Sequence, residues 1–137
     1  SKHTKLLLAL APATAGTSDS SHASNPIDMT GFEGARFIMT AGLTTGAGYG
    51  FTAEASTSTT VGDFAAFTTS ITAASTVNNR ILFLDVYRPT RRYLRVVSTT
   101  TTATDWGGVI CELYGASLSP TTHASTDVAA SGFGVST

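Results

Sequence analysis

Side chains that could do acid–base chemistry are few and scattered. The chain has nine carboxylates in 137 residues. Among them, Asp85 and Glu112 fall in neighbouring predicted strands, where they could meet. Two facing carboxylates are what hydrolysis of a glycosidic bond requires, but a pair on a strand surface explains these two residues equally well. The sequence predicts no catalytic residues and a protein that is not an enzyme.

Metal and nucleophile chemistry find little support in the pattern. His3, His22 and His123 lie in polar segments without the spacing of a ligand pair, and Cys111 lies within a predicted strand. Hydroxyl side chains abound, but the chain has no G-x-S-x-G nucleophile motif. We predict no metal site and no cofactor.

The glycine series Gly46-x-Gly48-x-Gly50 precedes a predicted strand. A dinucleotide-binding loop needs a strand before its glycines and a helix after them. We therefore interpret these glycines as part of a hairpin connection, and we expect no small-molecule substrate.

Arginines form the most conspicuous cluster. Five of the six fall within 16 residues along a predicted hairpin. Their forked side chains suit an interface with an acidic protein surface. The alternatives are a solvated hairpin tip with local pairs to Asp85 and Glu112, or contact with nucleic-acid phosphate, for which interleaved aromatics are limited to Tyr87 and Tyr93. The residues predicted to form a partner interface are Arg80, Arg88, Arg91, Arg92, Arg95 and Trp106.

Trp106, beside Gly107-Gly108, is interpreted first as a core or interface anchor. A second hypothesis makes it a stacking platform for carbohydrate, together with Tyr114 or Tyr49. A carbohydrate-binding sandwich therefore stays among the alternatives.

The charge composition also limits the classes of partner that the chain is expected to bind. Charged residues make up 12 % of the chain and the net charge is −1. No global field would attract nucleic acid or an acidic membrane, so neither is expected as a partner. So sparsely charged a surface is poorly protected from association, which suggests that copies of the chain or a larger partner cover it.

The 25 Thr and 15 Ser residues favour strands and loops over helices. Turn signals recur about every ten residues, which is typical of a sandwich. The sequence predicts an all-β fold, an antiparallel β-sandwich or jelly roll of about seven to eight strands. Expected strands cover 5–11, 35–41, 49–55, 68–73, 80–87, 92–97 and 109–114, with hairpins at 42–48 and within 80–97, and a helical turn or short strand that starts at Asp63.

One β domain is expected over 1–137. Residues 1–26 form an N-terminal arm with the first strand, 27–115 the sandwich core, and 116–137 an extended C-terminal tail. The run from Leu6 to Leu10 is similar to the start of a signal peptide, but we interpret it as a strand or packed arm. No stretch approaches the ~20 apolar residues of a membrane-spanning helix.

Three stretches resemble small virion proteins of tailed bacteriophages, encoded among the head genes, that serve as capsid decoration (cement) proteins. They are Ile27-Asp28-Met29-Thr30-Gly31-Phe32-Glu33-Gly34 leading into Arg36-Phe37-Ile38-Met39, then Arg91-Arg92-Tyr93-Leu94-Arg95-Val96-Val97, and then Val109-Ile110-Cys111-Glu112-Leu113-Tyr114-Gly115. The resemblance spans roughly 27–115, and the tail 116–137 is longer than the simplest members would have.

The resemblance implies a β-sandwich bound outside the viral shell, often as trimers at local three-fold positions, that stabilises the shell against internal pressure. It implies the major capsid protein as partner, a homotrimer, the outer capsid surface as location, and no catalytic residues. Low charge fits this independently, because weak contacts suffice when many copies bind a lattice. Another virion component, of the tail or baseplate, is the second hypothesis.

Overall fold

Strands dominate the protein. The structure is a computed structural model that describes residues 3–12, 21–41, 50–72, 79–99, 106–118, 121–124 and 126–130. The strands are β1 (Lys5–Leu10), β2 (Ser21–Ala23), β3 (Ile27–Asp28), β4 (Gly34–Ala41), β5 (Gly50–Ser56), β6 (Ala65–Thr72), β7 (Ile81–Tyr87), β8 (Tyr93–Thr99) and β9 (Trp106–Tyr114), with one 3₁₀ turn, η1 (Val61–Asp63).

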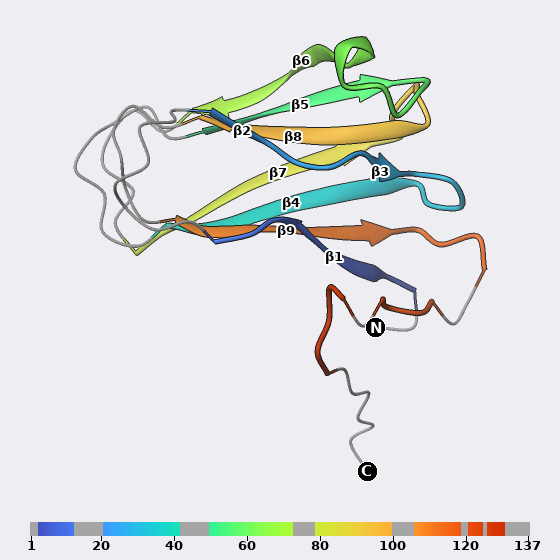
Figure 1. Ribbon diagram of the computed structural model, residues 1–137. Helices are drawn as coiled ribbons and strands as arrows, with labels where there is room; N and C mark the ends of the chain where they lie inside the picture. Colours follow the sequence, from blue (N-terminus) through green and yellow to red (C-terminus); the bar gives the residue numbers. More distant parts are fainter. Residues whose placement is uncertain are drawn as a thin grey trace.

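Two sheets lie face to face (Figure 1). Sheet A has the order β1-β9-β4-β7, and sheet B has the order β2-β8-β5-β6, with β3 also paired to β8. Each of these pairings is antiparallel. The predicted all-β antiparallel sandwich is therefore confirmed, and the jelly roll stays a prediction. No helix in the described part of the chain is long and apolar enough to cross a membrane.

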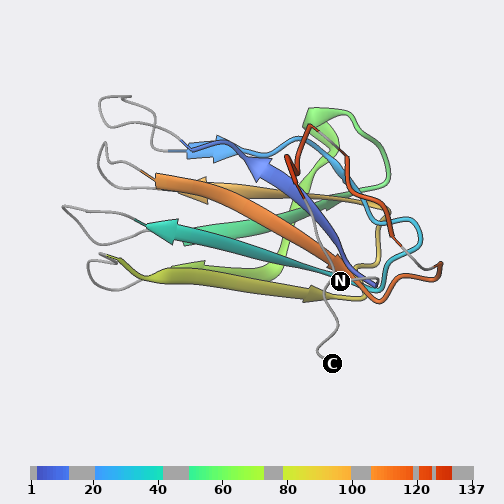
Figure 2. The same ribbon diagram turned by 90° about the horizontal axis from the view of Figure 1, so that it is seen from below.

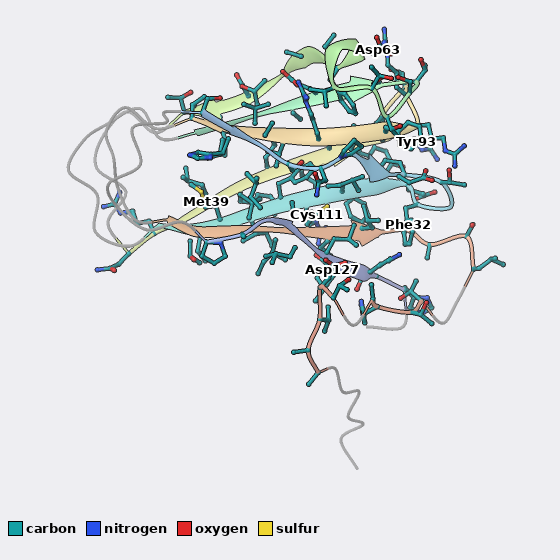
Figure 3. The ribbon with its side chains drawn as sticks, viewed as in Figure 1. Phe32, Met39, Asp63, Tyr93, Cys111 and Asp127 are labelled. Atoms are coloured by element: carbon teal, nitrogen blue, oxygen red, sulfur yellow. The ribbon has the colours of Figure 1, made fainter. Side chains whose placement is uncertain are left out.

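Alternation along the strands builds the core. Because successive side chains in a strand point to opposite faces, every second residue of β4 faces sheet B. Phe37 and Met39 of β4 and Cys111 of β9 are completely buried, and Figure 3 shows Met39 and Cys111 between the sheets. The core consists of Ile27, Met29, Ala35, Phe37, Met39, Ala53, Ala55, Leu84, Val86, Leu94, Val96, Val109, Cys111 and Leu113.

The predicted hairpin over 80–97 is wrong. β7 belongs to sheet A and β8 to sheet B, so the turn between them carries the chain from one sheet to the other. The same is true of 35–41 and 49–55, which lie in different sheets as β4 and β5. Two consecutive apolar strands have the same sequence pattern whether they pair in one sheet or lie in opposite sheets, and here they lie in opposite sheets.

Two smaller expectations are also corrected. The arm predicted over 1–26 contains a second strand, because β2 pairs with the edge of β8. A helical turn or a short strand was expected to start at Asp63, but η1 ends at Asp63 and β6 begins at Ala65. The Asp63 carboxylate accepts a hydrogen bond from the Ser58 hydroxyl at 2.6 Å. Both features come from long-range or side-chain contacts that a local pattern does not show.

Backbone hydrogen bonds fix one end of sheet A, where the turns after β3, β7 and β9 meet. The Arg88 amide donates to the Glu33 carbonyl at 2.8 Å, and the Ser117 amide donates to the Gly31 carbonyl at 2.8 Å. Gly31 has a φ of 85°, which a residue with a side chain rarely adopts. This end therefore holds the turn between β7 and β8 in a defined place.

A C-terminal segment lies along β1, at the edge of sheet A (Figure 2). The Thr121 hydroxyl donates to the Thr4 carbonyl at 2.5 Å, and the Leu6 amide donates to Nδ1 of His123 at 3.1 Å. These contacts occupy polar groups that an edge strand otherwise presents to solvent.

Cys111 should be chemically inert in the folded protein. Burial raises the pKa of its thiol to about 12, and the neighbouring Glu112 charge acts in the same direction. Since the thiolate is the reactive species, we expect iodoacetamide at about pH 8 to label the native chain far more slowly than the guanidinium-unfolded chain. Mass spectrometry measures both rates, and equal rates would contradict the buried position.

Candidate functional site

The predicted interface arginines do not form one patch. Arg88, Arg91 and Arg92 lie in the turn between β7 and β8, and Arg95 lies on the outer face of sheet B. Arg80 precedes β7, so the length of that strand separates it from the turn. Trp106 opens β9, but its side chain lies outside the part of the structure that is described.

Arg92 holds Asp28 in a two-pronged ion pair. Its guanidinium approaches the carboxylate oxygens at 2.8 and 3.1 Å. The same carboxylate accepts hydrogen bonds from the amide and hydroxyl of Thr30 at 3.0 and 2.7 Å. The hydrogen bond from Arg92 is the main reason that the pKa of Asp28 lies well below its ordinary value, because it stabilises the charged form.

Two further arginines are paired within the chain. Arg95 binds Glu54 across sheet B and lies over the Phe64 ring, with 13 % of its side chain exposed. Arg88 approaches Glu33 at 3.8 Å, but the side chains are 70 % and 53 % exposed, so this pair contributes little. In the described part of the chain, no ion pair involves Arg80 or Arg91.

Arg36, which the sequence analysis did not single out, organises the outer face of sheet A. Its guanidinium lies 3.3 Å from Asp85 on β7 and 3.6 Å from Glu112 on β9. β4 lies between those two strands, so Asp85 and Glu112 do not adjoin. Among the described residues, both pair with Arg36 and not with the clustered arginines, with which the alternative of a solvated hairpin tip paired them. The alternation of residues along strands 35–41, 80–87 and 109–114 indicates which charged side chains face outward. Only the order of the strands in the sheet shows that Arg36 lies between Asp85 and Glu112.

Tyr114 completes the group. Its hydroxyl donates to Asp85 at 2.6 Å, and its ring lies 4.7 Å below the Arg36 guanidinium. Burial and then the hydrogen bond to Asp85 raise the pKa of Tyr114 to about 12. The ring also lies over Gly34, where an added Cβ would be 2.3 Å from it. A ring that is in close contact with both Arg36 and Gly34 is a poor platform for a sugar.

Beside this polar group an apolar row crosses all four strands of sheet A. Leu8 is in register with Ile110, Ile110 with Ile38, and Ile38 with Phe83. Leu8, Ile110 and Phe83 are 43 %, 46 % and 49 % exposed, and Ile38 is half-buried. Four in-register apolar side chains on an outer face make a continuous strip of the kind that marks interaction surfaces. We call it the apolar row.

Sheet B presents a different outer face. Its central strands carry the Arg95–Glu54 ion pair and Thr52 there. Ser70 is the registered partner of Thr52 on β6. The two outer faces of the sandwich therefore differ in chemistry, and sheet A has the one suited to dry contact.

Metal and redox chemistry find no site in the described residues. No group of three His, Cys, Asp or Glu side chains there could hold a metal ion. His123 accepts a hydrogen bond from β1, and Cys111 is enclosed in the core. These residues have structural contacts that account for their positions.

Comparison with known proteins shows the fold alone. No family model matches the chain. No curated protein matches it either. Among solved structures, the PBSX exported protein XepA superposes with a TM-score of 0.54 and 16 % identity, over 80 % of this chain and 36 % of XepA. A pilus protein of Bacillus endospore appendages superposes with a TM-score of 0.49 and 16 % identity, over 83 % of this chain and 89 % of the pilus chain.

This chain thus spans about a third of XepA, 36 % of its length. At 16 % identity the similarity supports the two-sheet sandwich and no particular activity.

The Asp28–Arg92 pair should stabilise the fold only above the acid range. Because folding lowers the pKa of Asp28 below its ordinary 3.8, the stabilisation is present above that value and is lost as the pH falls toward the folded value. We expect Asp28→Asn to cost about 0.2–1 kcal/mol at neutral pH and nothing at low pH. Urea unfolding at a series of pH values measures this difference.

Neighbouring arginines provide the control. Arg92→Gln should reproduce the pH-dependent loss, whereas Arg91→Gln, which removes no ion pair in the described structure, should not. A loss that stays constant from neutral to acid pH in Asp28→Asn would contradict the role of this charge pair.

Proposed function

We propose that this chain is a virion structural protein, a capsid decoration protein that binds the outer surface of a tailed-phage head through sheet A. The observation that carries the proposal is the apolar row, in register across all four strands and exposed on one face. The proposed partner is the major capsid protein, and the proposed role is to stabilise the shell.

Contact chemistry supports this role. Side chains such as Leu8 and Ile110 gain about 25 cal/mol for each Å² of apolar surface that a partner covers. The ion pairs of Arg36 with Asp85 and Glu112 lie beside the apolar row and would supply the polar rim that interfaces commonly have. Repetition across a shell then makes a modest contact per copy sufficient.

The resemblance to decoration proteins points the same way. The turn Gly31-Phe32-Glu33 lies beside the strand that carries Arg36 and Ile38. XepA, which shares the sandwich, is an exported protein. A binding role also suits a chain in which Asp85 and Glu112 are both occupied by Arg36 rather than turned to a substrate. The proposal includes a trimer and no catalysis.

A tail or baseplate position would use the same face on a different lattice. Electron microscopy of particles labelled on this chain separates the two positions, since label on the head supports decoration and label confined to the tail contradicts it.

Variants of the apolar row test the proposal. We expect the double variant Leu8→Thr and Ile110→Thr to bind mature shells about tenfold more weakly, because it removes apolar contact while Thr, which is β-branched, still suits a strand. The measurement is co-sedimentation of the purified chain with empty shells of the phage that encodes it.

Val61→Thr is the matched control, because Val61 is 69 % exposed on η1, away from sheet A. It should bind as the unaltered chain does, and urea unfolding should show that the variants remain folded. Unaltered binding by the double variant, or an unaltered chain that never sediments with shells, would refute the proposal.

A further inference from the structure

β7 leaves one edge of sheet A open. It pairs with β4 on one side, and in the described part of the chain no strand pairs with its other side. Figure 2 shows it as the outermost strand of the sheet. An open edge is a row of amide and carbonyl groups able to pair with another chain.

The direction of these groups follows from one hydrogen bond. The Arg88 amide donates to Glu33 of the neighbouring chain segment, so Arg88 points toward β4. In an antiparallel pair the residues alternate in direction, so Val86, Leu84 and Leu82 also point toward β4. The amides and carbonyls that point to the open edge are those of Ile81, Phe83, Asp85 and Tyr87.

This edge lacks the usual protection. At the opposite edge of sheet A, the 121–123 segment bonds to β1, and the pairing of β1 with β9 has a register shift. The β5–β6 pairing at the edge of sheet B is shifted as well. β7 keeps seven regular pairs with β4 and contains a single charge, no proline and no glycine. Natural edge strands normally carry charges, prolines or bulges that prevent pairing.

A hollow adjoins the same edge. Its volume is about 420 Å³, and it lies between β7 and the start of β6. Ala55, Ala65, Ala66 and Val86 supply its apolar lining, and the turn after β7 closes it with Arg88 and Arg91. Small side chains leave room there for an apolar side chain of a strand placed beside β7.

Two arginines, Arg88 and Arg91, lie at the C-terminal end of the open edge of β7. In the described residues Arg91 has no ion pair, and the 3.8 Å contact between Arg88 and Glu33 is exposed to solvent. Arg88 has a φ of 48° before Pro89, a disfavoured conformation that is maintained by the hydrogen bond from its amide to the Glu33 carbonyl. Such strain is often stored at binding sites. The nearby Asp85 carboxylate is already bound by Arg36 and Tyr114.

We propose that β7 accepts an extended segment of a partner protein as an added antiparallel strand, with an apolar side chain in the hollow and a carboxylate on Arg91. Strand addition of this kind takes affinity from main-chain hydrogen bonds and specificity from adjacent pockets. A protein carboxylate suits the planar guanidinium of Arg91, and a nucleic acid would find no cationic track on a chain of net charge −1. The inference does not require the partner to be a viral shell.

A defined peptide tests the edge directly. The probe is the acetylated, amidated peptide Glu-Val-Thr-Val-Thr-Val-Thr, whose first residue would reach the arginine turn in antiparallel pairing. Hydrogen exchange followed by NMR should slow at the amides of Ile81, Phe83, Asp85 and Tyr87, by about tenfold when the peptide is at ten times its dissociation constant. The amides of Leu82, Leu84 and Val86 should keep their exchange rates, because they already bond to β4.

Matched variants test the carboxylate. Arg91→Glu should lower the affinity for the peptide about tenfold, because it removes a charge-assisted pair and adds a repulsion between two carboxylates. Arg80→Glu makes the same charge change at the other end of β7 and should leave the affinity unchanged. Replacing Glu by Gln in the peptide should weaken binding to the unaltered chain and should make Arg91→Glu neutral.

Five outcomes would overturn the proposal. The first four are no protection at these amides, protection that does not alternate along β7, equal losses in Arg91→Glu and Arg80→Glu, and protection that rises with protein concentration without peptide, which would identify a second copy as the occupant. Protection by the oligonucleotide dT12 in place of the peptide is the fifth. Shell sedimentation is a separate measurement, so the two proposals can fail independently.

Discussion

Burial between two sheets is the constraint on which the rest of the structure depends. β4 has Phe37 and Met39 fully enclosed, and the sheets could not close over a charge at those positions. Strand alternation then fixes the other side of the same strand, so Arg36 and Ile38 must face outward. The neighbouring strands alternate in the same way and are in register with β4. The ion pairs of Arg36 and the apolar row are therefore the outward-facing residues of the same strands whose inward-facing residues form the core.

Charge is scarce in this chain, and the fold uses most of its arginines to hold strands together. Arg92 ties β3 to the start of β8, Arg95 ties β8 to β5, and Arg36 spans three strands of sheet A. In the described residues this leaves Arg91 available in the turn after β7. The surface that remains is largely hydroxyl-rich or apolar, which suits association with a large partner.

The local sequence pattern was sufficient to predict where most strands lie, but it was insufficient to predict which strands pair with each other. Strands at 35–41, 80–87, 92–97 and 109–114 were predicted because apolar residues and β-branched residues mark them locally, and the sandwich followed. The predicted hairpin over 80–97 was wrong because consecutive strands have the same sequence pattern whether they lie in opposite sheets or pair in one sheet. β2 was missed because its sequence, Ser-His-Ala, has no strand signal and forms by pairing with β8. The role of Arg36 appeared only once β4 was placed between β7 and β9.

We propose that the outer face of sheet A contacts a repeating protein surface. Electron cryomicroscopy of particles that carry this chain tests it most directly, at a resolution that places Ile110 and Phe83. We expect shell density against the apolar row, with the outer face of sheet B toward solvent. A map with sheet B against the shell and the apolar row open to water would contradict it.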